Sequence, residues 1–201
     1  RCEIERGVDL LKVMATGGSL TPGSPADAVQ FSVTEIAAAV GEARARGLRV
    51  AAHANARGGL RNAVEAGVTS IEHGSYADQE ILERMRELGT FWVPTMAPAR
   101  IILEGPGARL ISPERRASAS KNWRARRQAV AEGIGLGVRL AAGTDAGVTL
   151  TEHGLVALEV ETFAALGLPP MQAIWTATRW AAELLGLEAE VGTLVEGRAA
   201  D

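Results

Sequence analysis

Two of the three histidines in the chain stand where a short apolar run ends. His53 follows residues 50–52, and His73 follows the run 68–71 after one glutamate. Neutral imidazole is a common ligand of divalent metals, and side chains at the ends of neighbouring parallel strands converge on one place. A lone histidine at a strand end is more often a hydrogen-bonded structural residue, so a metal site and a structural role both stay open for the pair.

Lys12 lies in "DLLKVMATGG", between Leu11 and Val13 of an apolar run. Burial of an ammonium group is costly and lowers its pKa toward the neutral amine. A neutral amine takes up carbon dioxide to give a carbamate, which is an anionic oxygen ligand. The alternative is a lysine that reaches the solvent at the strand end or pairs with a carboxylate.

Asp145 follows the long apolar run of "VRLAAGTDAG" after a Gly-Thr pair. A carboxylate with few solvated neighbours binds a metal or accepts a proton from metal-bound water. The alternative is an Asx turn, because Asp-Ala-Gly is ordinary turn sequence.

The elements that must position these residues alternate along the chain. Short apolar runs predict strands at Leu10–Met14, Arg49–Ala54, Thr69–Glu72, Phe91–Pro94 and Val138–Ala142. Helical spacing with capping residues predicts helices within 32–47, 78–89, 112–137, 151–167 and 169–187. Continuous apolar strands that alternate with helices favour a parallel α/β sheet. A (β/α) barrel, whose catalytic groups end the strands, fits this order better than a dinucleotide fold, since no GxGxxG opens a helix.

The chain resembles the amidohydrolase superfamily, in its imidazolonepropionase-like and Xaa-Pro dipeptidase (prolidase)-like branch. The resemblance rests on "LLKVMATGG", "AAHA", "SIEHG" and "GTDAG" followed by "HG", and on the closing "AIWTATRWAAELLGL" and "VGTLVEGRAAD". It implies a partial metal-dependent (β/α)8 TIM barrel that holds strands four to eight. It also implies two divalent metal ions, zinc by ligand type: carboxylated Lys12 bridges both, His53 and His73 bind one, and Asp145 binds the other and moves the proton.

The implied reaction is hydrolysis of C–N bonds in amides or peptide-like substrates by a hydroxide that bridges the metals, of the dipeptidase or carboxypeptidase type. A lactonase or phosphotriesterase on the same site and an inactive metal-binding fragment are the alternatives. Asn55, Gly17 and His153 are candidate substrate-binding residues. Asn55 stands where relatives often carry an aromatic residue or histidine, and His153 lies in the loop after Asp145.

The expected organisation is a catalytic barrel over residues 1–190 and the start of a small C-terminal β-domain over 191–201. Both ends look cut, and no His-x-His pair of the family's first strand is present. We therefore expect a fragment of a longer protein, whose N-terminal strands are missing.

The composition excludes several classes of protein. A net charge of −3 gives no general attraction to nucleic acid or anionic membranes, and no apolar run reaches the length of a membrane helix. Cys2 is the only cysteine, so no internal disulfide forms. The basic run 115–127 is interpreted as a solvated helix face, and Met171, Ile174, Trp175 and Leu185 as core. We expect a cytoplasmic homo-oligomer.

Overall fold

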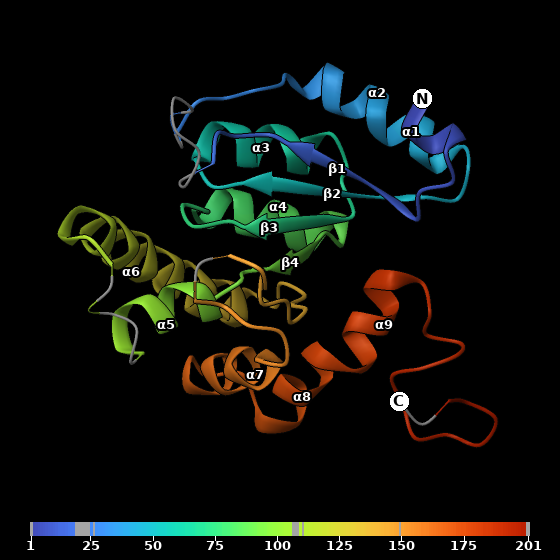
Figure 1. The fold of residues 1–201 in the computed structure, drawn as a ribbon. Coiled ribbons are helices and arrows are strands. Elements are labelled where there is room, and N and C mark those ends of the chain that lie inside the picture. Colours follow the sequence, from blue (N-terminus) through green and yellow to red (C-terminus); the bar gives the residue numbers. More distant parts are fainter. Residues whose placement is uncertain are drawn as a thin grey trace.

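The protein is an α/β chain with one parallel sheet (Figure 1). A computed structural model describes residues 2–18, 25, 27–105, 109, 111–148 and 150–199. The strands are β1 (Leu10–Met14), β2 (Arg49–Ala54), β3 (Ser70–His73) and β4 (Phe91–Val93), and they lie side by side in chain order. The four strands confirm the sequence prediction within one residue at each end. Their register sets Met14 opposite His53 and Ala54 opposite His73, so the residues that end the strands gather at one edge.

The fifth predicted strand, over Val138–Ala142, is wrong as a strand. Only one parallel bridge forms, between Trp92 and Leu140. The backbone N–H of Trp92 donates to the carbonyl of Arg139 at 2.8 Å, and the backbone carbonyl of Trp92 accepts from the N–H of Ala141 at 2.9 Å. The ladder stops there because Pro94 has no N–H for the next bond and because the Thr90 N–H already donates to Met85 at 2.9 Å. The segment nevertheless runs beside β4 and carries the chain to Asp145.

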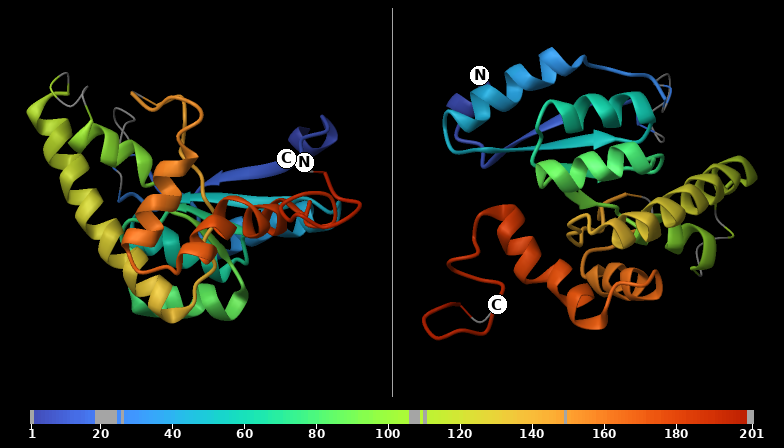
Figure 2. Two further views of the ribbon diagram at one scale, coloured as in Figure 1. Left: turned by 90° about the horizontal axis from the view of Figure 1, so that it is seen from below. Right: turned by 180° about the vertical axis from the view of Figure 1, so that it is seen from behind.

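Three helices cover one face of the sheet: α2 (Val33–Arg44), α3 (Arg57–Glu65) and α4 (Gln79–Leu88). They lie in front of the strands in the rear view of Figure 2. The predicted caps are present: Ser32 and Glu35 form a capping box on α2, and Asp78 caps α4, which ends at Gly89 with φ 68°. The main core fills the space between these helices and the sheet and includes Val50, Ala52, Ala54, Ile71 and Trp92 from the strands.

The opposite face of the sheet is more open. Leu10 and Met14 of β1 are 42% and 43% exposed on it. A small second cluster of Phe91, Val93 and Ala141 packs there against Trp180 and Leu184. Strand alternation assigns the side chains of Lys12 and Glu72 to this face as well.

The remaining helices follow β4: α5 (Ala97–Glu104), α6 (Pro113–Leu136), α7 (Val156–Ala165), α8 (Pro170–Ala177) and α9 (Arg179–Leu185). The helix predicted within 169–187 breaks at Thr178, whose φ is −127° and ψ −97°. Met171, Ile174 and Leu185 are 59%, 49% and 56% exposed, so their assignment to the core is wrong in this structure. Helical spacing identified a common face but not whether another element covers it.

The chain begins with the short helix α1 (Cys2–Glu5) and ends, as far as it is described, in turns and bends from Val191 to Ala199. The start of a β-domain over 191–201 and the numbering of the strands as four to eight of a barrel both stay predictions. Among the described residues no helix is long and apolar enough to cross a membrane.

Candidate active site

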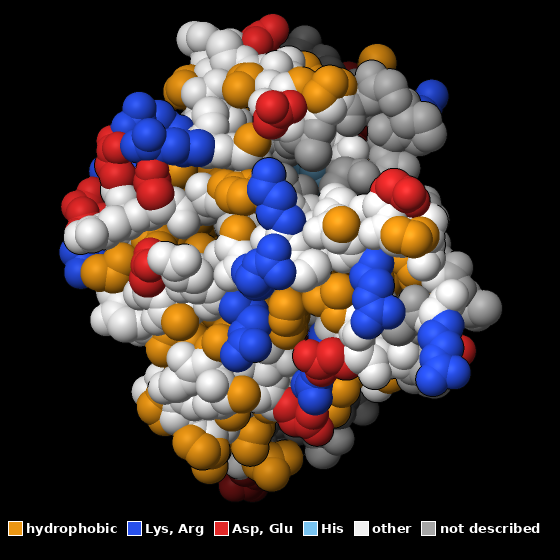
Figure 3. Space-filling view, turned by 90° about the vertical axis from the view of Figure 1, so that its left-hand side faces the viewer, with side chains coloured by type: hydrophobic (Ala, Val, Ile, Leu, Met, Phe, Trp, Pro, Cys, Tyr) orange, Lys and Arg blue, Asp and Glu red, His pale blue; other side chains and the backbone are white. Residues whose placement is uncertain are grey.

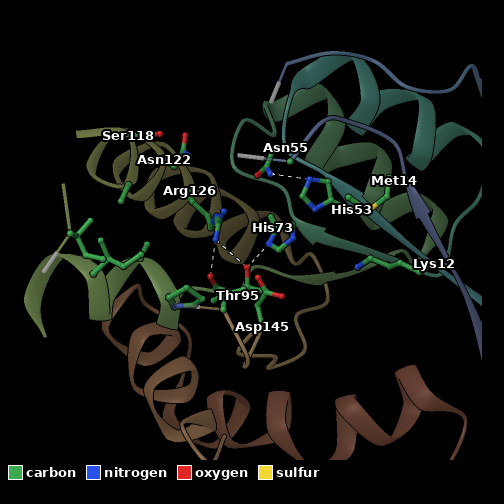
Figure 4. Close-up of a pocket in the computed structure, with 17 residues that line it drawn as sticks. Lys12, Met14, His53, Asn55, His73, Thr95, Ser118, Asn122, Arg126 and Asp145 are labelled. Carbon is green, nitrogen blue, oxygen red and sulfur yellow. Dashed lines mark hydrogen bonds between the residues drawn. The ribbon is translucent and has the colours of Figure 1, made fainter. Parts of the chain in front are cut away.

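A cavity of about 400 Å³ opens at the carboxyl ends of the strands (Figure 4). Lys12, His53, His73 and Asp145 all line it, so the four residues that were predicted to carry the chemistry share one cavity. The opposite wall comes from α5 and α6 and contains Pro98, Ala99, Ile102, Ser118, Ala119, Asn122 and Arg126. Figure 3 looks onto this end of the molecule, where a histidine side chain is visible in the hollow.

The imidazole rings of His53 and His73 meet edge to face. Their centroids lie 4.6 Å apart with an angle of 67° between the planes. His53 is the fifth residue of β2 and His73 the last residue of β3. The predicted convergence of two strand-end histidines is therefore present in the structure.

His73 reaches the cavity because the backbone turns at this residue. Regular alternation along β3 would point it to the helix side, like the fully buried Ile71. Instead His73 has φ 70° and Gly74 φ 62°, a left-handed pair that turns the chain at the strand end. The indole N–H of Trp92 donates to the His73 carbonyl at 3.1 Å and holds the turn. A left-handed, non-glycine residue is strained, and such strain is concentrated at functional sites.

The hydrogen bonds of the two rings define which nitrogen of each ring is free. Nε2 of His53 lies 3.2 Å from the Gly17 carbonyl, which only accepts, so Nε2 carries the hydrogen and Nδ1 is left with its lone pair. Nδ1 of His73 lies 2.7 Å from the Thr95 hydroxyl, which in turn donates to the Pro94 carbonyl at 2.7 Å. In this arrangement Nδ1 of His73 donates, and Nε2 keeps its lone pair.

Both rings are held in the neutral form that ligates metals. Burial lowers the pKa of His53, and burial together with the neighbouring charges of Arg126 and His53 holds the pKa of His73 well below its usual value. The imidazoles therefore have the chemistry of a metal-ligand pair at neutral pH.

Lys12 and Asp145 lie on the same cavity in more open positions. Lys12 is exposed as a residue on β1. Partial burial of its ammonium group nevertheless lowers the pKa of Lys12, while the negative charges of Glu72 and Asp145 act to raise it. The expected full burial of Lys12 is thus not met. Asp145 is exposed in an irregular segment, with φ 52°. Within the described part of the chain no three histidine, cysteine, aspartate or glutamate side chains come together as a metal-binding group. The two histidines fit a divalent cation, whereas the complete ligand set stays a prediction.

The three residues predicted to bind substrate lie in different places. Asn55 lines the cavity, is buried, and accepts a hydrogen bond from Ser75 at 2.7 Å. Gly17 contacts the site only through its carbonyl on His53, while the neighbouring Gly18 lines the cavity. His153 is exposed in a turn and is not among the lining residues that the structure describes.

Arg126 is the main residue that the sequence interpretation missed. It lies in the basic run that was assigned to a solvated face, but it is only 9% exposed and lines the cavity. Burial lowers its pKa to about 10, so the guanidinium is still charged at neutral pH. Spacing on the helix contained the signal: Trp123, Arg126 and Val130 lie at steps of three and four and are all buried.

Glu159 of α7 is a second missed residue and is fully buried. Its carboxylate accepts hydrogen bonds from the backbone N–H groups of Met96 and Ala97 at 2.9 and 2.6 Å, where α5 begins. Burial raises its pKa to about 7, although these two bonds and the charge of Arg126 act in the opposite direction. Glu159 therefore fixes the chain directly after Thr95.

Comparison with known proteins agrees with this fold and shows the family of the chain. The model of the amidohydrolase family matches residues 1–201. Ochratoxinase of Aspergillus niger is 35% identical over an alignment that covers 100% of this chain and 41% of that protein. Imidazolonepropionase of Symbiobacterium thermophilum is 32% identical over 85% of this chain and 36% of its own length. A crystal structure of a Xaa-Pro dipeptidase with bound methionine superimposes with a TM-score of 0.88 and 35% identity, covering 98% of this chain and 48% of the other.

The chain belongs to the amidohydrolase family, in the branch that contains imidazolonepropionases and prolidases. It spans less than half the length of these relatives.

Proposed function

We propose that the protein is a metal-dependent hydrolase of amide or peptide-like C–N bonds, of the dipeptidase or carboxypeptidase type. The observation that carries this proposal is the meeting of two neutral imidazoles, with rings 4.6 Å apart, in the cavity at the strand ends of an amidohydrolase chain. The likeness to a Xaa-Pro dipeptidase supports a dipeptide-like substrate.

The residues of the chain would divide the work as follows. Nδ1 of His53 and Nε2 of His73 would hold one divalent cation, Lys12 as a carbamate would bridge to a second, and Asp145 would complete the site. Bound zinc would polarise the substrate carbonyl and lower the pKa of the attacking water. Asp145 would accept the proton of that water and deliver it to the leaving nitrogen, for which its exposed position leaves room.

The other wall of the cavity would bind the substrate. Ala99, Ile102 and Ala119 supply apolar surface, and a cavity of about 400 Å³ suits a ligand of dipeptide size. The amide of Asn55 would face the polar end of the substrate from the strand side. A homo-oligomeric assembly and a cytoplasmic location are further expectations that accompany this function.

Metal content tests the proposal. The protein, expressed in the longest form that its gene encodes, is analysed for bound metals beside a Lys12→Ala variant and an exposed control, His153→Asn. We expect about two zinc ions per chain in the parent and the control, and one or fewer after Lys12→Ala. Absence of bound metal in the parent would overturn the proposal.

A substrate screen then separates the reaction classes. Dipeptides and N-acyl amino acids are compared with lactones and phosphotriesters. Hydrolysis of the first group supports the proposed function, while hydrolysis of only lactones or phosphotriesters would assign the site to the alternative class.

A further inference from the structure

One buried guanidinium is linked to both histidines, to His73 through Thr95 and to His53 through Ser75 and then Asn55. Arg126 lies on α6, on the far side of the cavity from β2 and β3, and its side chain points toward Thr95 (Figure 4). It donates to two hydroxyl groups and two carbonyls. This arrangement differs from a simple surface arginine, because every acceptor lies at the carboxyl end of β3 or β4.

One group of hydrogen bonds connects Arg126 to His73 through Thr95. Nη1 of Arg126 donates to the carbonyls of Pro94 and Thr95 at 2.8 and 2.7 Å and to the Thr95 hydroxyl at 3.1 Å. Thr95 has φ 51°, a strained conformation for a β-branched residue that these bonds help to hold. The hydroxyl accepts from Arg126 and donates to Pro94, so its remaining lone pair accepts the Nδ1–H of His73 at 2.7 Å.

The opposite tautomer of His73 would make one hydrogen bond fewer among the same atoms. The Thr95 hydroxyl would then donate to Nδ1, and its bond to the Pro94 carbonyl would be lost. The bond between Thr95 and Pro94 thus favours the tautomer in which Nε2 of His73 is unprotonated and free in the cavity, and Arg126 holds both of these groups in the positions that the bond requires.

A second group of hydrogen bonds connects Arg126 through Ser75 to Asn55, which lies beside His53. Nε and Nη2 of Arg126 donate to the Ser75 hydroxyl at 3.0 and 2.8 Å. This hydroxyl must then use its own hydrogen toward Asn55, whose Oδ1 accepts it at 2.7 Å. The bond orients the Asn55 amide with Nδ2 3.5 Å from Nε2 of His53; because Nε2 donates to the nearer Gly17 carbonyl at 3.2 Å, Nδ2 is a packing neighbour at the edge of the ring.

The charge of Arg126 is not explained by a direct ion pair. Its acceptors are all neutral, and among the described residues no carboxylate lies within 4.0 Å of it. Glu159 and Asp145 attract it from a longer distance. A buried charge without a close partner is expensive, and an apolar residue would fill this place on the apolar stripe of α6 at lower cost.

We propose that Arg126 is a positioning residue, which holds Thr95, Ser75 and Asn55 so that His53 and His73 present fixed nitrogens to a cation in the cavity. The inference rests on the proposed function, since it assigns these nitrogens to a metal. It goes beyond that function by placing the control of the ligand geometry on α6, outside the strands that carry the ligands.

The test uses Arg126→Met, which keeps an unbranched apolar side chain and removes every N–H. Arg124→Met is the matched control, because Arg124 is exposed on the same helix and donates only to Ser120 among the described contacts. The protein in its longest encoded form is labelled with ¹⁵N-histidine, and the His73 signals are assigned as those lost in His73→Asn. Tautomers are read from ¹⁵N shifts without metal, and affinity is measured by titration with zinc alone.

We expect a single Nδ1–H tautomer of His73 in the parent and in Arg124→Met. In Arg126→Met we expect a mixture of tautomers and a zinc affinity lower by roughly 10- to 100-fold. A folded Arg126→Met protein with the parent's tautomer and zinc affinity would overturn the inference, because a purely structural tie would leave both unchanged.

If Arg126→Met does not fold, the variants Thr95→Val and Thr95→Ser test the same inference. Valine removes the hydroxyl at constant shape, while serine keeps it. We expect a mixture of His73 tautomers in Thr95→Val and the parent's single tautomer in Thr95→Ser. The same tautomers in both variants would contradict the proposed connection from Arg126 through Thr95 to His73. If the parent binds no zinc, the proposed function fails, whereas the tautomer ratios still decide the role of Arg126.

Discussion

His73 and Thr95 are joined by the shortest contact of either histidine ring among the described residues, 2.7 Å from Nδ1 to the hydroxyl. His73 is the last residue of β3 and Thr95 lies two residues after the end of the neighbouring β4, and both have positive φ angles. The ring is therefore fixed by a residue that is itself strained and held by Arg126 and by the turn into α5. Rigid placement of a ligand in this way is what a metal site requires before the metal arrives.

The two histidines should act on one cation, and a double substitution tests this. We expect His53→Asn and His73→Asn each to lower zinc affinity by about 100-fold or more. The double variant should bind zinc only slightly less tightly than the single variant with the lower affinity, because the effects of two residues that bind the same ion are not additive. Zinc titration of the three variants measures the coupling. Independent, additive losses would indicate that the two rings serve different ions, and His153→Asn is the control that should leave binding unchanged.

Gly74 should tolerate no side chain. A Cβ there would lie 2.5 Å from Nε1 of Trp92, and φ is 62°. We expect Gly74→Ala to lower the free energy of unfolding by about 3 kcal/mol or more, through overpacking added to the cost of the left-handed conformation.

Gly47→Ala is the control for that experiment, because Gly47 has φ 70° but nothing within 4 Å of its added Cβ. It should cost about 1–2 kcal/mol, the conformational part alone. Urea unfolding measures both variants, and equal losses would show that contact with Trp92 is unimportant.

Glu159 should make stability depend on pH with a sign opposite to that of an ordinary acidic residue. Burial raises its folded pKa from 4.5 to about 7, with Arg126 and the N–H groups of Met96 and Ala97 as the facing groups. Its contribution is fully present below pH 4.5 and is lost as the pH rises through about 7, by up to about 3 kcal/mol at about 1.4 kcal/mol per pKa unit.

We therefore expect the parent to lose stability relative to Glu159→Gln between pH 5.5 and 8.5, as measured by urea midpoints. Glu161→Gln is the control, because Glu161 is exposed on the same helix and pairs with Arg100. Parallel pH profiles for the parent and Glu159→Gln would disprove the assignment of the effect to this carboxyl group.

Ala119 should limit the size of the substrate if the α5–α6 wall binds its apolar part. Ala119→Leu fills part of this wall, whereas Ala117→Leu adds the same volume at an exposed position of α6 outside the cavity. We expect Ala119→Leu to lower kcat/KM for dipeptides with bulky side chains by about 10-fold or more relative to glycine-containing ones, as overpacking costs of 1–3 kcal/mol predict. An unchanged ratio in both variants would place the substrate elsewhere.

Local sequence patterns were sufficient to predict the frame of the site. Apolar runs of four to six residues identified the four strands β1 to β4, and the capping residues Ser32, Asp78 and Gly89 located the helix ends. Because parallel strands end at one edge, the sequence predicted that Lys12, His53, His73 and Asp145 converge there, and in the structure all four line one cavity. Their roles as ligands stay predictions.

The features that failed depend on contacts between distant parts of the chain. The strand predicted at Val138–Ala142 forms only one bridge because of Pro94, the residue that follows the neighbouring strand β4. Arg126 was misassigned because charge composition was given more weight than its place on an apolar helical stripe. The exposure of Met171 and Ile174 depends on what covers α8, which helical periodicity does not contain.

Trp92 gives the molecule a built-in optical probe. Its indole is completely buried, donates to the His73 carbonyl and lies against Gly74, so the chromophore and the turn that aims the histidine form one unit. Tryptophan emission responds to the hydrogen bond of the indole and to nearby imidazolium. A shift of the turn by a fraction of an ångström would therefore appear as a change in fluorescence, without any label and before any product is formed.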